Sequence, residues 1–146
     1  MQHVQTRSTT SALVLTAVLI ALATLFTMYT KIPVPGIRGY FNVGDVVIMT
    51  SALLLGRKYG AYIGAIGPAL ADLFLGYAVF VPITFVVKGI EGYLVGTVYN
   101  NKTTTSALMA TIVGGIIIVA GYFIAEYFVF DPGVAIASIV TNTIQA

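Results

Sequence analysis

The residues from roughly Thr104 to Phe128 form a very apolar run in which Glu126 is the one charged side chain. A helix of this length is longer than the roughly 30 Å hydrocarbon core of a bilayer is thick. The rest of the chain has a similar character, since 58% of its 146 residues are hydrophobic and 8% are charged. A soluble domain of this size would leave too much apolar surface in water. The sequence therefore predicts a protein embedded in a lipid bilayer.

Proline, glycine and polar breaks divide the chain into further apolar segments. We expect an all-α membrane protein, a compact bundle of six transmembrane helices that forms one domain over residues 1–146. The expected helices cover roughly residues 9–29, 44–55, 59–76, 80–100, 104–129 and 132–146. At 1.5 Å per residue the last segment reaches only about two-thirds of the way across a bilayer, so we expect the sixth helix to be incomplete at Ala146.

Lysine and arginine are unevenly distributed between the two sides of such a bundle. One side would hold Arg7, Arg57, Lys58 and Lys102, and the other Lys31 and Arg38 with Asp45 and Asp131. Cytoplasmic loops carry the excess of basic residues in membrane proteins. We therefore expect a multi-pass protein of the cell membrane with a cytoplasmic N-terminus, and an outward-facing segment at residues 30–45.

This segment, residues 30–45, cannot be helical and is called the lid from here on. Pro33 and Pro35 fix φ and lack amide donors, and several glycines allow tight turns. Recognition groups lie between these breaks, namely the rings of Tyr40 and Phe41, the amide of Asn42 and the carboxylate of Asp45. The plainer interpretation is a connector whose aromatic side chains anchor at the membrane interface. We favour a loop that covers a ligand.

Ionisable side chains inside the expected helices are functional candidates, because a charge in hydrocarbon is costly. Lys88 and Glu91 are three residues apart and share a helix face. Lys88 could pair with Glu91 or, between helices, with Asp72. An ion pair that only fixes helix packing is as good an interpretation as contact with a ligand.

Three further polar residues lie in the last two apolar segments. Glu126 lies near the outer end of its helix, where it could reach water or a ligand. Asn142 and Gln145 are three residues apart on one helical face. Amides in an apolar helix need partners, so these two either bond neighbouring helices or contact a polar solute.

Several functions lack the residues that they require. The chain has no cysteine and no G-x-x-x-x-G-K-[ST], H-E-x-x-H or G-x-S-x-G motif. We therefore expect no metal, no cofactor and no nucleotide hydrolysis by the chain itself. Its scattered basic residues do not indicate nucleic-acid binding. Asp72 and Glu91 could form the acid pair of an intramembrane protease, but nothing around them supports this, and we expect a protein that is not an enzyme.

Four features together resemble the substrate-binding S components of energy-coupling factor (ECF) vitamin transporters. These are Gly39-Tyr-Phe-Asn-Val-Gly-Asp45, the following Ala-Leu-Leu-Leu-Gly at 52–56, Gly67-Pro-Ala-Leu-Ala-Asp72, and Pro82-x-Thr-Phe-x-x-Lys88-Gly-x-Glu91-Gly. The similarity extends over most of the chain, from the first helix to the start of the sixth. The subgroup that it resembles binds hydroxymethylpyrimidine, pyridoxine or riboflavin.

The resemblance implies a protein that binds a water-soluble vitamin or precursor beneath the lid. It also implies partners, which are a transmembrane coupling subunit and two cytosolic ATPases. Ala17 and Ala21 are four residues apart on the first helix, and their small side chains would allow another helix to approach closely. This Ala-x-x-x-Ala pattern is similar to the motif by which S components dock on the coupling subunit.

The expected site combines aromatic rings with a few directed polar groups. Its candidate residues are Tyr40, Phe41, Asn42, Asp45, Lys88, Glu91, Tyr122, Glu126, Asn142 and Gln145. This combination suits a small heteroaromatic ring with hydroxymethyl or amino groups, of the hydroxymethylpyrimidine or pyridoxine type. Riboflavin is the alternative solute. A structural membrane subunit without a small ligand is the alternative from another functional class.

Overall fold

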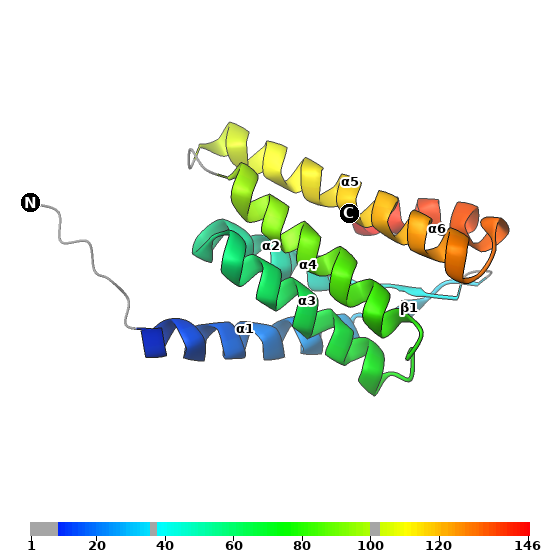
Figure 1. The fold of residues 1–146 in the computed structure, drawn as a ribbon, viewed down its shortest axis with the longest axis horizontal. Helices are drawn as coiled ribbons and strands as arrows, with labels where there is room; N and C mark the ends of the chain where they lie inside the picture. The colour runs from blue at the N-terminus through cyan, green and yellow to red at the C-terminus, as the bar shows by residue number, and fades with distance from the viewer. Residues whose placement is uncertain (1–8, 36–37, 100–102) are drawn as a thin grey trace, which may run out of the picture.

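The computed structural model describes residues 9–35, 38–99 and 103–146 of the chain. Within these residues there are six helices and one short hairpin, which lies toward one end of the bundle (Figure 1). The helices are α1 (Thr9–Tyr29), α2 (Gly44–Leu55), α3 (Arg57–Phe74), α4 (Phe80–Val98), α5 (Thr104–Val129) and α6 (Pro132–Gln145), and the strands are β1 (Ile32–Pro33) and β2 (Tyr40–Phe41). The architecture is all-α, as expected, with a lid that contains a small antiparallel sheet.

Local residue chemistry accounts for where the helices begin and end. Gly56 adopts a φ of +88°, a conformation that favours glycine, so one residue separates α2 from α3. For this reason α3 begins at Arg57, earlier than the expected residue 59. The Asp131 side chain accepts a 3.0 Å hydrogen bond from the Val134 amide and caps α6, with Pro132 in the first turn. The helix expected at 80–100 extends to Val98, and residue 100 lies outside the described part of the chain.

Helix α3 lies in the middle of the bundle and packs against α1, α2 and α4, while α5 packs against α4 and α6. Figure 1 shows α3 and α4 side by side. Their backbones approach so closely that a Cβ on Gly92 would collide with the carbonyl oxygen of Gly60. Small residues allow this contact, which positions the polar side chains of α4 against α2 and the lid.

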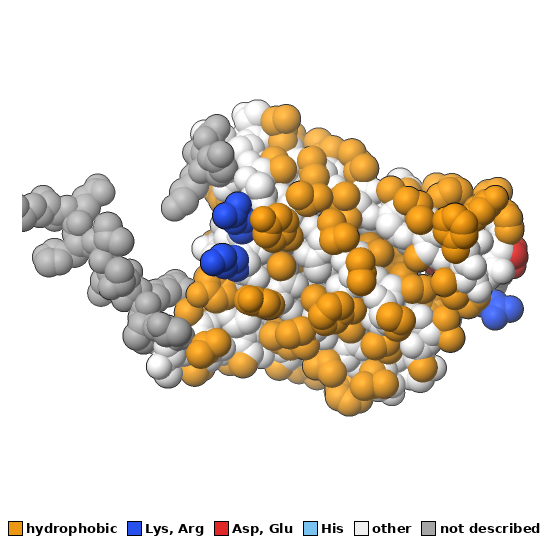
Figure 2. All heavy atoms as spheres, viewed as in Figure 1, with side chains coloured by type: hydrophobic (Ala, Val, Ile, Leu, Met, Phe, Trp, Pro, Cys, Tyr) orange, Lys and Arg blue, Asp and Glu red, His pale blue; other side chains and the backbone are white. Residues whose placement is uncertain are grey.

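The flanks of the bundle are apolar. Large hydrophobic side chains such as Leu54 (77% exposed) and Phe128 (80% exposed) point outward, and hydrophobic side chains cover most of the face shown in Figure 2. Among the described helices, α1, α4 and α5 are long and apolar enough to cross a membrane, and α2 is apolar but shorter. Such a surface is stable in lipid rather than in water, so this is a membrane protein.

Basic residues occur at both ends of the bundle. Arg57 and Lys58 lie at the start of α3, at the end of the bundle opposite the lid (Figure 1). Lys31 and Arg38 lie in the lid itself. The other two residues of the expected basic side, Arg7 and Lys102, are outside the described residues.

Candidate functional site

The lid folds back over the ends of the helices as a hairpin. Ile32 pairs with Phe41 and Pro33 with Tyr40. The Tyr40 hydroxyl donates a 2.5 Å hydrogen bond to Asp72 Oδ1 on α3. Burial, together with the nearby Asp72 carboxylate, raises the pKa of Tyr40, so its hydroxyl stays a donor. The lid is thereby attached to the middle of the bundle.

A small cavity lies beneath the lid and has a volume of about 40 Å³. That volume has room for about three water molecules. The lid, α1, α3, α4, α5 and α6 all contribute to its wall. The polar lining residues include Thr27, Tyr40, Asn42, Asp72, Thr84, Lys88, Tyr122, Glu126, Ser138, Asn142 and Gln145. So many polar groups around one cavity within an apolar bundle indicate a binding site for a polar ligand.

A cluster of three charged side chains lies beside the cavity and reaches it through Lys88. The Lys88 ammonium donates to Asp45 Oδ1 at the start of α2 and lies 3.3 Å from Glu91 Oε2 on its own helix. Lys88 is 2% exposed and Glu91 is fully buried. Within the described structure neither oxygen of Glu91 accepts a hydrogen bond, so its contact with Lys88 is electrostatic. The cluster holds α2 and α4 together at the base of the lid.

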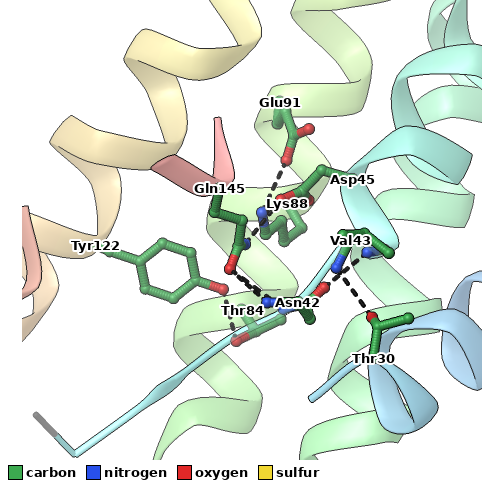
Figure 3. Close-up of polar contacts among 10 residues, drawn as sticks. Thr30, Asn42, Val43, Asp45, Thr84, Lys88, Glu91, Tyr122 and Gln145 are labelled. Atoms are coloured by element: carbon green, nitrogen blue, oxygen red, sulfur yellow. Dashed lines mark hydrogen bonds and ion pairs between the residues drawn. The ribbon is translucent and has the colours of Figure 1, made fainter. Parts of the chain in front are cut away.

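Gln145 connects the last turn of α6 to the lid, as Figure 3 shows. Its Oε1 accepts hydrogen bonds from the backbone amide of Asn42 (3.2 Å) and from Asn42 Nδ2 (3.3 Å). Its Nε2 donates to Asp45 Oδ2 at 2.7 Å. Asn42 Oδ1 in turn accepts from the Gly44 amide at 2.8 Å. Every one of these contacts joins residues that are buried or half-buried.

A second polar group lies between α5 and α6. The Ser138 hydroxyl donates to Glu126 Oε2, and Asn142 Nδ2 lies 3.5 Å from Ser138 Oγ. Glu126 is buried. Of the two possibilities that the sequence left open for Glu126, contact with water or with a ligand, the first is therefore wrong. On the facing side of the cavity, the hydroxyls of Thr84 and Tyr122 are 2.9 Å apart. These groups leave both donors and acceptors at the cavity wall.

Two aromatic residues that line the cavity, Tyr40 and Phe80, pack against further rings. The centroids of Tyr40 and Tyr77 are 5.0 Å apart, and those of Phe80 and Phe130 are 5.4 Å apart. Lys31 lies over the Tyr77 ring at 4.9 Å. Arg38 lies similarly over the Phe130 ring, at 5.1 Å. Cation–π contacts of this kind add to the attachment of the lid.

The structure brings most of the expected site residues together, with two corrections. Phe41 is not among the residues that line the cavity, because successive side chains of a strand point to opposite sides and Tyr40 takes the inner one. Lys88 pairs with Asp45 and Glu91 rather than with Asp72, because Asp72 is engaged by Tyr40. Asp45 and Glu91 contact Lys88 without lining the cavity themselves.

Sequence reasoning missed three hydroxyl residues that line the cavity, Thr27, Thr84 and Ser138. Two of them had a recognisable signal. Thr84 precedes Lys88 by four residues, and Ser138 precedes Asn142 by four, so each shares a helix face with a residue already chosen. Thr27 carried no such signal, because no residue chosen for the site lies three or four positions away from it.

Comparison with known proteins relates the chain to membrane transporter components. The family model of the ECF-type riboflavin transporter S component matches residues 7–146. A Pyrococcus woesei protein, described as an uncharacterized protein in gap 3′ region, is 40% identical over 126 residues, which are 84% of this chain and 83% of that one. The thiamine precursor transporter HmpT of Lactococcus lactis subsp. cremoris is 30% identical over 131 residues, 89% of this chain and 73% of that one.

Proteins of this family are transporter components and not enzymes. The arrangement of the acids agrees with this, because Asp72 is bonded to Tyr40 while Glu91 lies against Lys88. The two carboxylates are thus engaged by different partners rather than paired as a protease dyad. The chain belongs to the ECF-type riboflavin transporter S component family.

Proposed function

We propose that this chain is the membrane-embedded substrate-binding subunit of an ECF-type importer, and that it captures a water-soluble vitamin or vitamin precursor for ATP-driven uptake. The observation that carries this proposal is the polar cavity beneath the lid, where Asn42, Thr84, Lys88 and Glu126 lie around one space. These buried groups have partners within the chain, and a polar solute that entered the cavity could exchange hydrogen bonds with them.

The proposed solute is a single heteroaromatic ring with amino or hydroxymethyl groups, of the hydroxymethylpyrimidine or pyridoxine type. Tyr40 and Tyr122 offer ring faces for stacking at the cavity. The similarity to a relative named as a thiamine precursor transporter supports this choice. A cavity of about 40 Å³ must widen for any vitamin, and one ring requires less widening than the three fused rings of a flavin. Riboflavin is the alternative, which the name of the matching family favours.

A thermal-shift screen of the purified protein tests the proposal. Hydroxymethylpyrimidine, pyridoxine and riboflavin are added separately, and we expect one of them to raise the melting temperature, because a ligand that binds only the folded state stabilises it. Asn42→Ala should abolish that shift, since Asn42 lies at the cavity. If no vitamin or precursor shifts the melting temperature, the alternative of a structural membrane subunit without a small ligand is favoured.

The proposed partners are those of the family, a transmembrane coupling subunit and two cytosolic ATPases. Ala17 and Ala21 support a docking face on α1, because both are exposed on that helix. We further propose that the chain crosses the cell membrane several times, with its N-terminus in the cytoplasm and its lid outside. Arg57 and Lys58 at the end away from the lid support this orientation.

A further inference from the structure

The orientation of the Gln145 carboxamide is fixed by its partners. The backbone amide of Asn42 can only donate, so the atom that faces it must be Oε1. The Asp45 carboxylate accepts, so the atom that faces Asp45 Oδ2 must be Nε2. Gln145 therefore presents an acceptor to Asn42 and a donor to Asp45 from one planar group.

The other side-chain oxygens of Asn42 and Asp45 are already occupied by partners other than Gln145. Asp45 Oδ1 is engaged by Lys88, and Asn42 Oδ1 accepts from Gly44. The atoms that remain are the backbone N–H and Nδ2 of Asn42 and Oδ2 of Asp45, and Gln145 takes all three. Asn42 is 8% exposed and Asp45 4%. Without the carboxamide these atoms would lie buried and unpaired, which is costly.

The same side chain also lines the cavity, which is too small for a vitamin ring. Gln145 is the last residue of α6, a helix that packs mainly against α5 and β2 among the described elements. It reaches the lid through its side chain (Figure 3). Rotation of that side chain would enlarge the cavity and free the atoms of Asn42 and Asp45 at once.

From this geometry we propose that the Gln145 carboxamide is an internal stand-in for one edge of the transported solute, and that the solute carries a hydrogen-bond acceptor and an N–H donor separated by a single carbon atom, as in an amide. The inference rests on the proposed function. An aminopyrimidine has such an edge, since its ring nitrogen accepts and its exocyclic amino group donates. Binding then exchanges one amide-like edge for another, so the buried atoms are never left unpaired.

A stand-in and a contact residue predict opposite results for the same substitution. If Gln145 competes with the solute, Gln145→Ala removes the competitor, and the apparent affinity for the solute found in the vitamin screen rises about tenfold, equivalent to about 1.4 kcal/mol. If Gln145 instead contacts the bound solute, the affinity falls. A fall, or no change, would overturn the proposal. Should Gln145→Ala fail to fold, Gln145→Met keeps the length of the side chain and the same rise is expected.

Chemical rescue tests the stand-in without any vitamin, in the purified full chain. We expect Gln145→Ala to lower the melting temperature, and 4-aminopyrimidine to restore it because this probe has the acceptor and donor of the lost amide. The matched probe 4-methylpyrimidine has a similar shape but no N–H donor, so it should not restore it. Equal responses to both probes, or none, would contradict the proposal. Thr143→Ala, two residues away on the exposed side of α6, is the control variant and should respond to neither probe.

The vitamin screen and the chemical rescue distinguish failure of the proposed function from failure of the stand-in proposal. If no vitamin binds but 4-aminopyrimidine rescues Gln145→Ala selectively, the site that accepts an amide-like edge is supported and the proposed importer function is contradicted. If a vitamin binds but the rescue fails and its affinity for Gln145→Ala falls, the importer function stands and the stand-in is wrong.

Discussion

The Tyr40 hydroxyl donates a 2.5 Å hydrogen bond to Asp72 Oδ1 and so joins the lid to α3 across 32 positions of sequence. Asp72 is 3% exposed, so the Tyr40 hydroxyl supplies a hydrogen bond to a carboxylate that lies away from bulk solvent. The neighbouring Tyr77 packs its ring against that of Tyr40 at 5.0 Å. At Tyr40 the lid is therefore held by a directed bond and by a ring contact that can be removed separately.

Removing the directed bond should loosen the lid. In Tyr40→Phe the ring contacts remain but the buried Asp72 carboxylate loses its donor, and we expect a loss of about 1–3 kcal/mol of stability. Thermal unfolding measures this loss, and spin labels on the lid and on α3 measure lid opening. Tyr77→Phe is the matched control, because it removes a hydroxyl and keeps the ring. If the two variants behave alike, the bond to Asp72 does not hold the lid.

The charged cluster predicts an asymmetric response to substitution. Lys88→Met leaves Asp45 and Glu91 buried without their cation, and we expect destabilisation of about 3–5 kcal/mol. The double variant Lys88→Met with Asp45→Asn should recover part of the lost stability, because one of the two uncompensated charges is then removed. Thermal unfolding of the single and double variants forms a double-mutant cycle. Strict additivity would show that Lys88 and Asp45 are not coupled.

The polar group between α5 and α6 should depend on Ser138 more than on Asn142. Ser138→Ala removes the donor to the buried Glu126 and is expected to cost about 1–3 kcal/mol. Asn142→Ala removes a contact of 3.5 Å, which is weak, and should change thermal stability little. The reverse order of melting temperatures would contradict this assignment.

The small residues of α1 predict an effect on assembly alone. Ala17→Leu and Ala21→Leu should reduce co-purification with the coupling subunit and the ATPases, because bulk on this face keeps a partner helix away. Both residues are exposed and neither lines the cavity, so vitamin binding by the isolated subunit should not change. Ala137→Leu places the same substitution on the exposed side of α6 and is the control. An equal loss of assembly in Ala137→Leu would remove the docking role from α1.

The sequence by itself predicted the helical, membrane-embedded character of the chain and the non-helical lid. Both follow from local physics, because runs such as 104–128 are apolar enough for a bilayer, and Pro33 and Pro35 cannot continue a helix. The shared face of Lys88 and Glu91 was predictable for the same reason, since helical periodicity depends only on spacing.

Only the tertiary structure decided which of these groups meet. Asp45 as the partner of Lys88, and Gln145 as the partner of Asn42, join residues 43 and 103 positions apart. Such pairs depend on how helices pack and on how the lid folds back, and spacing along the chain carries no information on either. That Tyr40 lines the cavity and Phe41 does not depended in the same way on how the lid folds back, since neighbouring residues of a strand take opposite sides.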